Sequence, residues 1–115
     1  MNDVLSSSDG KTWTQVTSSA AWTPRQKHSL LVFNNMLYLL GGIDNSTSYM
    51  NDIWSSSDGE TWTKITDNAS WSKRYGHAGV VFNNKIWIMG GDNGSLLGDA
   101  WYSSNENASS WTQAS

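Results

Sequence analysis

Two long segments of this 115-residue chain are near-copies of each other. The chain opens with MNDVLSSSDGKTWTQVT, and the closely similar MNDIWSSSDGETWTKIT begins at residue 50. When residues 1–49 are aligned with residues 50–98, nearly half of the positions are identical, and parts of a third copy begin near Asp99. Internal repetition on this scale is typical of solenoids, propellers and repeat arrays, whose units bury their apolar surface against neighbouring units. The repeat therefore predicts a repeat architecture.

The first half of each unit has the composition of two inner β-strands. In the first complete unit they are the apolar runs 28–34 and 36–42, separated by Asn34-Asn35. Paired asparagines tolerate the positive φ angles that a tight hairpin turn demands. Because the runs are almost continuously apolar, we expect both faces of these strands to be covered.

The second half of each unit has the composition of an outer hairpin. Segments 52–58 and 60–66 alternate polar and apolar residues more clearly, and Asp58-Gly59 supplies the turn. No segment has the pattern of a long amphipathic helix. Four short strands in a unit of this length are typical of one blade of a β-propeller. The sequence therefore predicts an all-β fold of four-stranded antiparallel blades.

The order of the repeated residues resembles the kelch repeat. Arg-x-x-His precedes two apolar strands, which end in Gly-Gly and are followed by Asn-Asp-x-Trp and a strand with a further Trp. The matching residues are Arg25, His28, Gly41, Gly42, Asn51, Asp52, Trp54 and Trp62, and then Arg74, His77, Gly90, Gly91, Asp99, Trp101 and Trp111. The first copy departs from the pattern at Leu5, where the other copies have Trp54 and Trp101.

This resemblance implies a kelch-type β-propeller, similar to bacterial kelch proteins and to the central domain of galactose oxidase. Residues 1–22 would form an outer half-blade, 23–71 a full blade and 72–115 another full blade of one propeller domain. Closed propellers have roughly 4–8 blades. We therefore expect a fragment of a longer protein, or a chain that completes a ring as a homo-oligomer.

A second resemblance concerns the outer hairpins. SSSDGKTW and SSSDGETW are similar to the Asp box of sialidase-type propellers, although Asp9 to Trp13 and Asp58 to Trp62 are one residue shorter than that motif. The Asp box is a structural turn, so this resemblance implies a stabilised outer hairpin in each repeat.

Candidate binding residues lie in the segments that precede the inner strands or follow the glycine pairs. In a propeller these connections form one face, and loops on a rigid scaffold carry function in many folds. Their cations, carboxylates, amides and aromatic rings suit a peptide, a glycan or an anion. The candidates are Trp22, Arg25, Asp44, Asn45, Trp71, Arg74, Tyr75, Asp92 and Asn93.

A purely structural role is an alternative for several of these residues. Arg25 and Arg74 would then pair with the backbone or with carboxylates of a neighbouring blade. Trp22 and Trp71 would pack between blades instead of offering a platform for sugar stacking. The remaining tryptophans are expected to pack as well: Trp13, Trp54, Trp62, Trp87, Trp101 and Trp111.

The sequence contains no recognised catalytic pattern. There is no Cys, so a copper enzyme resembling galactose oxidase lacks its cross-link, and two Arg cannot form a sialidase-type arginine cluster. His28 and His77 do not have metal-ligand spacing and are expected to be structural. No Walker loop, Ser-His-Asp pattern or zincin motif occurs. We therefore expect no enzyme, no cofactor and no metal.

A non-catalytic module that binds a protein or a glycan on its loop face is the function that these features favour. The net charge of −3 and a pI near 5.0 give no basic surface for nucleic acid. No apolar run reaches the ~20 residues of a membrane span. The composition, rich in Ser, Thr, Asn and Trp, weakly favours an exported protein. The alternative is part of a carbohydrate-active propeller enzyme, similar to kelch-type sialic acid mutarotases or to sialidases.

Overall fold

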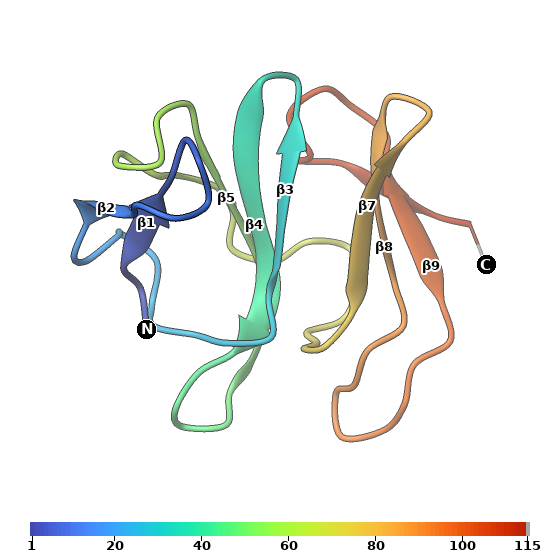
Figure 1. Ribbon diagram of the computed structural model, residues 1–115. Coiled ribbons are helices and arrows are strands. Elements are labelled where there is room, and N and C mark those ends of the chain that lie inside the picture. The colour runs from blue at the N-terminus through green and yellow to red at the C-terminus, as the bar shows by residue number, and fades with distance from the viewer. Residues whose placement is uncertain (115) are drawn as a thin grey trace.

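The computed structural model describes residues 1–114, which form three antiparallel sheets and no helix. The sheets lie side by side, with β1 near one end of the molecule and β9 near the other (Figure 1). In chain order the strands are β1 (Val4–Ser6), β2 (Thr14–Thr17), β3 (Ser29–Phe33), β4 (Met36–Ile43), β5 (Tyr49–Ser56), β6 (Thr63–Thr66), β7 (Ala78–Phe82), β8 (Lys85–Met89), β9 (Ala100–Ser103) and β10 (Trp111–Gln113).

Two of the sheets are complete four-stranded units. One has the order β3-β4-β5-β6 and the other β7-β8-β9-β10, with every neighbouring pair antiparallel. The third sheet contains only β1 and β2, the counterparts of β5 and β6 one repeat earlier. The predicted all-β fold with four-stranded antiparallel units is confirmed. None of the described residues forms an apolar helix of membrane-spanning length.

The turns of the inner hairpins follow the predicted chemistry. Asn34 and Asn35 have φ values of 50° and 60°, and Asn83 and Asn84 have 53° and 60°. Asparagine occupies this left-handed region more easily than most residues, so the pair closes a two-residue turn between adjacent strands.

The Gly-Gly pair is required because two sheets approach each other closely there. Gly41 has a φ of 63°, and a Cβ on it would lie 2.9 Å from Cε1 of His77. The amide of Gly42 donates to the carbonyl of Arg74 at 3.0 Å, which joins the first complete sheet to the segment that enters the second. Any larger residue would separate the two sheets at this point.

The main core lies between the two complete sheets. Tyr38, Leu40 and Ile53 of the first sheet pack with Ile86 and Ile88 of the second, and all five are buried. A smaller cluster between the first two sheets contains Trp22, Leu39 and Trp62. Each sheet therefore buries its apolar side chains against the next sheet, as a repeat architecture requires.

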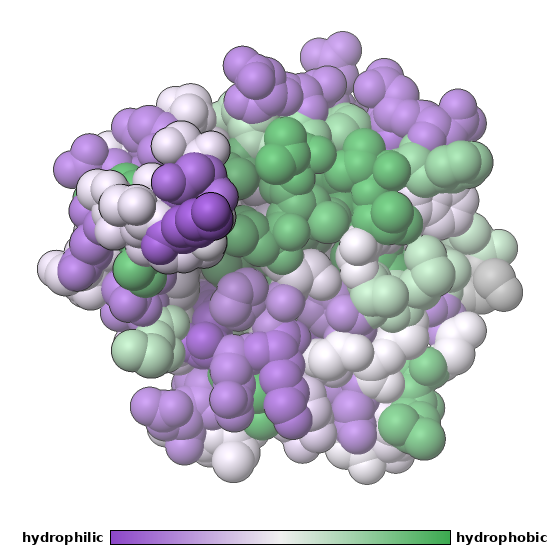
Figure 2. All heavy atoms as spheres, in the orientation of Figure 1, coloured by the Kyte–Doolittle hydropathy of each residue, from purple (hydrophilic) through white to green (hydrophobic). Residues whose placement is uncertain are grey.

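The expectation that both faces of the inner strands are covered is wrong for β3 and β7. Leu30 and Val32 of β3 are 53% and 65% exposed, and Phe82 of β7 is 67% exposed. Figure 2 shows apolar side chains gathered on the face that contains these inner strands. The cause is the number of sheets: β3 lacks a complete sheet on one side, and β7 has a neighbour only on the side of β3.

Two tryptophans also differ from the expected packing. Trp13 is 58% exposed, because its counterpart Trp62 packs against Trp22, whereas the position that would pack on Trp13 precedes residue 1 in the repeat. Trp87 is only partly buried and stacks on Tyr102 at 5.1 Å on the open side of the last sheet.

Candidate functional site

The connections that hold the predicted site residues lie at one end of the sheets. The loop after β4 and the loop after β8 both project from the lower end in Figure 1, next to the segment that runs into β3. We call this end the loop face and define it by residues 23–28, 43–50, 72–77 and 91–98. The structure brings loops from both complete sheets together here.

Arg74 lies beneath this face as a buried clamp within its own sheet. Its Nη1 and Nη2 donate to Oδ1 and Oδ2 of Asp99 at 2.7 and 2.9 Å, and Nη1 also donates to the carbonyl of Gly90 at 3.0 Å. Further bonds reach the carbonyl and the hydroxyl of Ser72. Its side chain is fully buried, so no donor is directed toward a ligand.

Arg25 repeats this clamp one unit earlier. It forms a two-pronged pair with Asp52 at 2.6 and 2.9 Å, and it donates to the carbonyls of Gly41 and Thr23. The structural alternative expected a carboxylate of a neighbouring blade, but Asp52 belongs to the same sheet that Arg25 enters. The arginines therefore hold each loop to its own sheet.

The two aspartates have lowered pKa values for this reason. The hydrogen bonds from Arg74 lower the pKa of Asp99 to about 2, and Trp101 contributes a further bond to the same carboxylate at 2.8 Å. Burial acts to raise the pKa of Asp52, but the bonds from Arg25 and Trp54 outweigh it and the pKa is lowered. Both carboxylates are charged at neutral pH.

Trp22 and Trp71 are buried and offer no ring to a ligand on the loop face. Trp71 packs edge-on against Trp111 at 5.8 Å, and Trp22 packs in the same way against Trp62 at 5.9 Å. Among the predicted aromatic residues, Tyr75 is the one that remains partly exposed. The geometry therefore matches the packing alternative for both tryptophans.

His77 is a buried neutral histidine next to this clamp. Its ring lies 6.0 Å from that of Trp71. Burial lowers the pKa of His77 to about 4, and the positive charge of Arg74 lowers it further. His28, at the same repeat position, also has a lowered pKa because of burial and Arg25. Within residues 1–114, no three His, Cys, Asp or Glu side chains gather in a metal-binding arrangement.

A cluster that the sequence did not single out as a unit joins the two complete sheets on the loop face. The rings of Tyr49 and Tyr75 lie 5.2 Å apart, and Nζ of Lys27 lies 5.3 Å from the Tyr75 ring. The negative charge of Asp92 raises the pKa of Tyr75, so its hydroxyl stays protonated at neutral pH. The sequence signal was weak, because Tyr49 and Lys27 lack counterparts in the repeat at 98 and 76.

The polar residues after the glycine pairs shape their own loops. Oδ1 of Asp44 accepts from the amides of Ser46 and Ser48, both at 2.9 Å, and Oδ1 of Asp92 accepts from the amide of Gly94 at 2.7 Å. Asn45 and Asn93 are exposed beside them. The aspartates thus fix the loop backbone, while the asparagine side chains remain accessible.

The outer hairpins have the turn geometry expected for an Asp box. Oδ1 of Asp58 accepts from the amides of Glu60 and Thr61, both at 2.9 Å, and Oγ of Ser56 accepts from the amide of Gly59. Asp9 makes the equivalent bonds in the first hairpin. These bonds use the carboxylates within the turn and lower their pKa values.

Comparison with protein families matched residues 2–115 to the model of the KLHDC2/KLHL20/DRC7 Kelch-repeats domain. The chain belongs to the kelch-repeat family. The Arg-Asp clamp, the Gly-Gly contact and the four-stranded sheets are thus the features of successive kelch blades. Comparison with curated proteins found no match.

Proposed function

We propose that this kelch domain is a non-catalytic module that binds a protein through its loop face. The observation that carries the proposal is the cluster of Tyr49, Tyr75 and Lys27. It is assembled from two sheets, partly exposed and supported from below by the buried clamp of Arg74. Membership of the kelch family supports a protein-binding role.

The composition of the cluster suits a protein partner. Tyrosine rings supply large contact areas with few rotatable bonds, and they are enriched among the residues that contribute most to binding at protein interfaces. A shallow hollow next to the cluster is lined by Tyr49, Met50 and Lys73, with Asp67 at its edge. The mixture of aromatic, thioether and charged groups is that of a hydrophobic centre with a polar rim.

Panning a random peptide library against the full chain tests this function. We expect enriched peptides to bind the wild type and to lose at least about tenfold in affinity with Tyr75→Ala, since central aromatic residues commonly contribute ~2 kcal/mol or more. Trp13→Ala is the matched control, because Trp13 is an exposed aromatic residue outside the loop face. Peptides that bind both variants equally would contradict the assignment.

A carbohydrate ligand is the alternative, and the same variants distinguish it. A panel of free oligosaccharides that binds in a Tyr75-dependent manner, with no peptide enriched, would favour a glycan-binding face. Saturable turnover of such sugars, abolished when Asp44 or Asp92 is replaced, would favour the carbohydrate-active enzyme. Binding without turnover would favour the module.

A further inference from the structure

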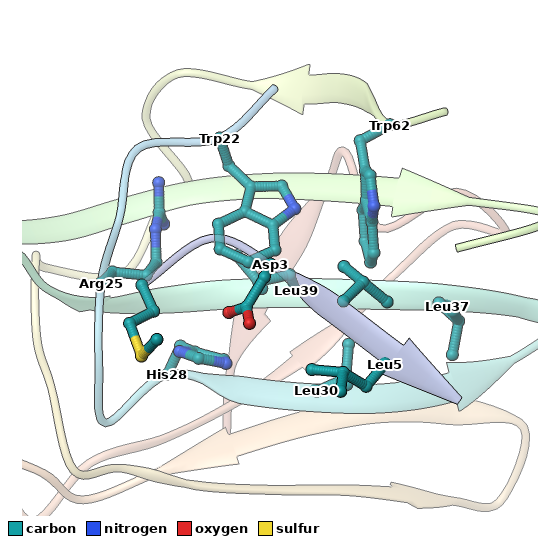
Figure 3. A pocket seen from close by; sticks show the side chains of 11 residues that line it. Asp3, Leu5, Trp22, Arg25, His28, Leu30, Leu37, Leu39 and Trp62 are labelled. Atoms are coloured by element: carbon teal, nitrogen blue, oxygen red, sulfur yellow. The ribbon is translucent and has the colours of Figure 1, made fainter. Parts of the chain in front are cut away.

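The largest cavity in the described chain lies between the two-stranded sheet and the first complete blade. It has a volume of about 290 Å³ and lies far up the blade face, under β1. Trp22, Trp62 and Leu39 form its buried wall, and Leu5 and Leu30 lie at its open side (Figure 3). The cavity is therefore an apolar groove with an aromatic wall, separate from the loop face.

The repeat shows what occupies the equivalent position one blade later. The counterparts of Trp22, Leu39 and Trp62 are Trp71, Ile88 and Trp111, which are all buried. They are covered by the β3-β4 hairpin, whose Phe33, Tyr38 and Leu40 belong to the same core cluster.

The edge of β1 is also incomplete. Its counterpart β5 pairs with β6 on one side and with β4 on the other, whereas β1 pairs with β2 and with no other described strand. In the complete blade, Leu40, Leu39 and Tyr38 of β4 lie opposite Ile53, Trp54 and Ser55. The corresponding residues of β1 are Val4, Leu5 and Ser6.

The width of the groove limits its occupant to two strands. Each complete blade presents four strands to its neighbour. In the first position β1 and β2 already provide the two outer strands, so the open four-stranded face of a second copy would overlap them. A two-stranded hairpin fits without such overlap.

We propose that this groove binds a β-hairpin from a further repeat of the same pattern, which pairs with the free edge of β1 and completes the first blade. The hairpin carries large apolar side chains at alternating positions, an Asn-Asn type of turn and a terminal Gly-Gly. Backbone hydrogen bonds supply the affinity, and the groove selects the side chains, as in other cases of strand addition.

Leu30 sets an additional requirement on this hairpin. Its counterpart is Gly79, where an added Cβ would lie 2.8 Å from Oγ of Ser29 and 3.3 Å from Cδ1 of Leu31. Leu30 occupies that space in the groove, so the incoming hairpin needs a small residue where β3 has Leu31. The groove is therefore selective, and a copy of β3-β4 fits only after that position is reduced.

An extended chain tests the proposal. A second copy of residues 28–49, with Leu31→Ala made in the copy alone, is placed before Met1, because residues 28–49 also precede Met50 directly. We expect the thermal midpoint to rise by about 5 °C or more. We also expect hydrogen exchange at the Val4–Ser6 amides to slow by at least about tenfold, because strand pairing protects amides.

Matched variants separate groove binding from general stabilisation. Leu30→Asp puts a charge into the groove at an exposed position, and it should abolish both effects of the extension. Leu96→Asp, at an 88% exposed position outside the groove, should leave both effects intact. An extension that raises the midpoint equally in both variants, or that leaves exchange at β1 unchanged, would overturn the proposal.

Sedimentation of the unextended chain provides a further test. We expect a monomer, because a second copy cannot enter the groove beside β1 and β2. A stable dimer that Leu30→Asp disrupts would assign the groove to a second copy and overturn the proposal.

Discussion

Arg74 and Asp99 form a two-pronged ion pair, with Nη1–Oδ1 and Nη2–Oδ2 distances of 2.7 and 2.9 Å. The same guanidinium bonds to the carbonyls of Gly90 and Ser72. One side chain thereby joins the loop before β7, the end of β8 and the start of β9.

Replacing this arginine should strongly destabilise the chain. We expect Arg74→Ala to lower the free energy of unfolding by about 3–5 kcal/mol, because it leaves Asp99 without its charged partner. Arg74→Lys should recover little, since one ammonium cannot form the planar two-pronged pair. Urea unfolding measures both. Lys64→Ala, which breaks the exposed pair with Asp67, is the control and should cost less than about 1 kcal/mol. Similar losses for the two alanine variants would contradict the role of the clamp.

Stability should decrease as the pH falls from about 6.5 toward 4. The pKa of His77 is about 4 in the folded chain and 6.5 as the ordinary value, so in this range the unfolded chain binds more protons. The difference corresponds to about 2 kcal/mol between pH 7 and pH 5. The urea midpoint at the two pH values measures it, and His77→Gln should remove most of the dependence. His28 shifts in the same direction and accounts for part of the remainder. An unchanged pH profile in His77→Gln would refute the assignment.

Two tryptophans at the same repeat position should respond differently to truncation. Trp62 is 7% exposed, packs against Trp22 and donates from Nε1 to the carbonyl of Gly59 at 3.0 Å. We expect Trp62→Ala to cost about 3–5 kcal/mol of unfolding free energy. Trp13 is 58% exposed, so Trp13→Ala should remain within about 0.5 kcal/mol of the wild type. Chemical unfolding of the two variants measures the difference, and equal costs would show that repeat position outweighs burial.

The sequence predicted the strands because its periodicity and its turn residues act locally. The Asn34-Asn35 turn and the inner strands lie within a residue or two of their predicted positions. The same local signals indicated the kelch family, which the match over residues 2–115 confirms.

The contacts between blades were harder to predict because they depend on the number of neighbours. Trp13 and Trp62 have nearly identical local sequences, yet one is exposed and the other buried. Arg25 and Arg74 were assigned to the right loops, but their partners Asp52 and Asp99 come from their own sheets. The cluster of Tyr49 and Tyr75 escaped notice because only the fold brings the two rings together.

The difference between Leu30 and Gly79 has a consequence for the order of assembly. Repeats with identical contact surfaces can be joined in any order, and a misplaced unit then costs nothing. Here one surface carries a leucine at the position where the next carries a glycine that tolerates no added carbon atom. Each neighbour can therefore recognise which blade it is joining. A single pair of residues acts as an address within a chain that otherwise repeats itself.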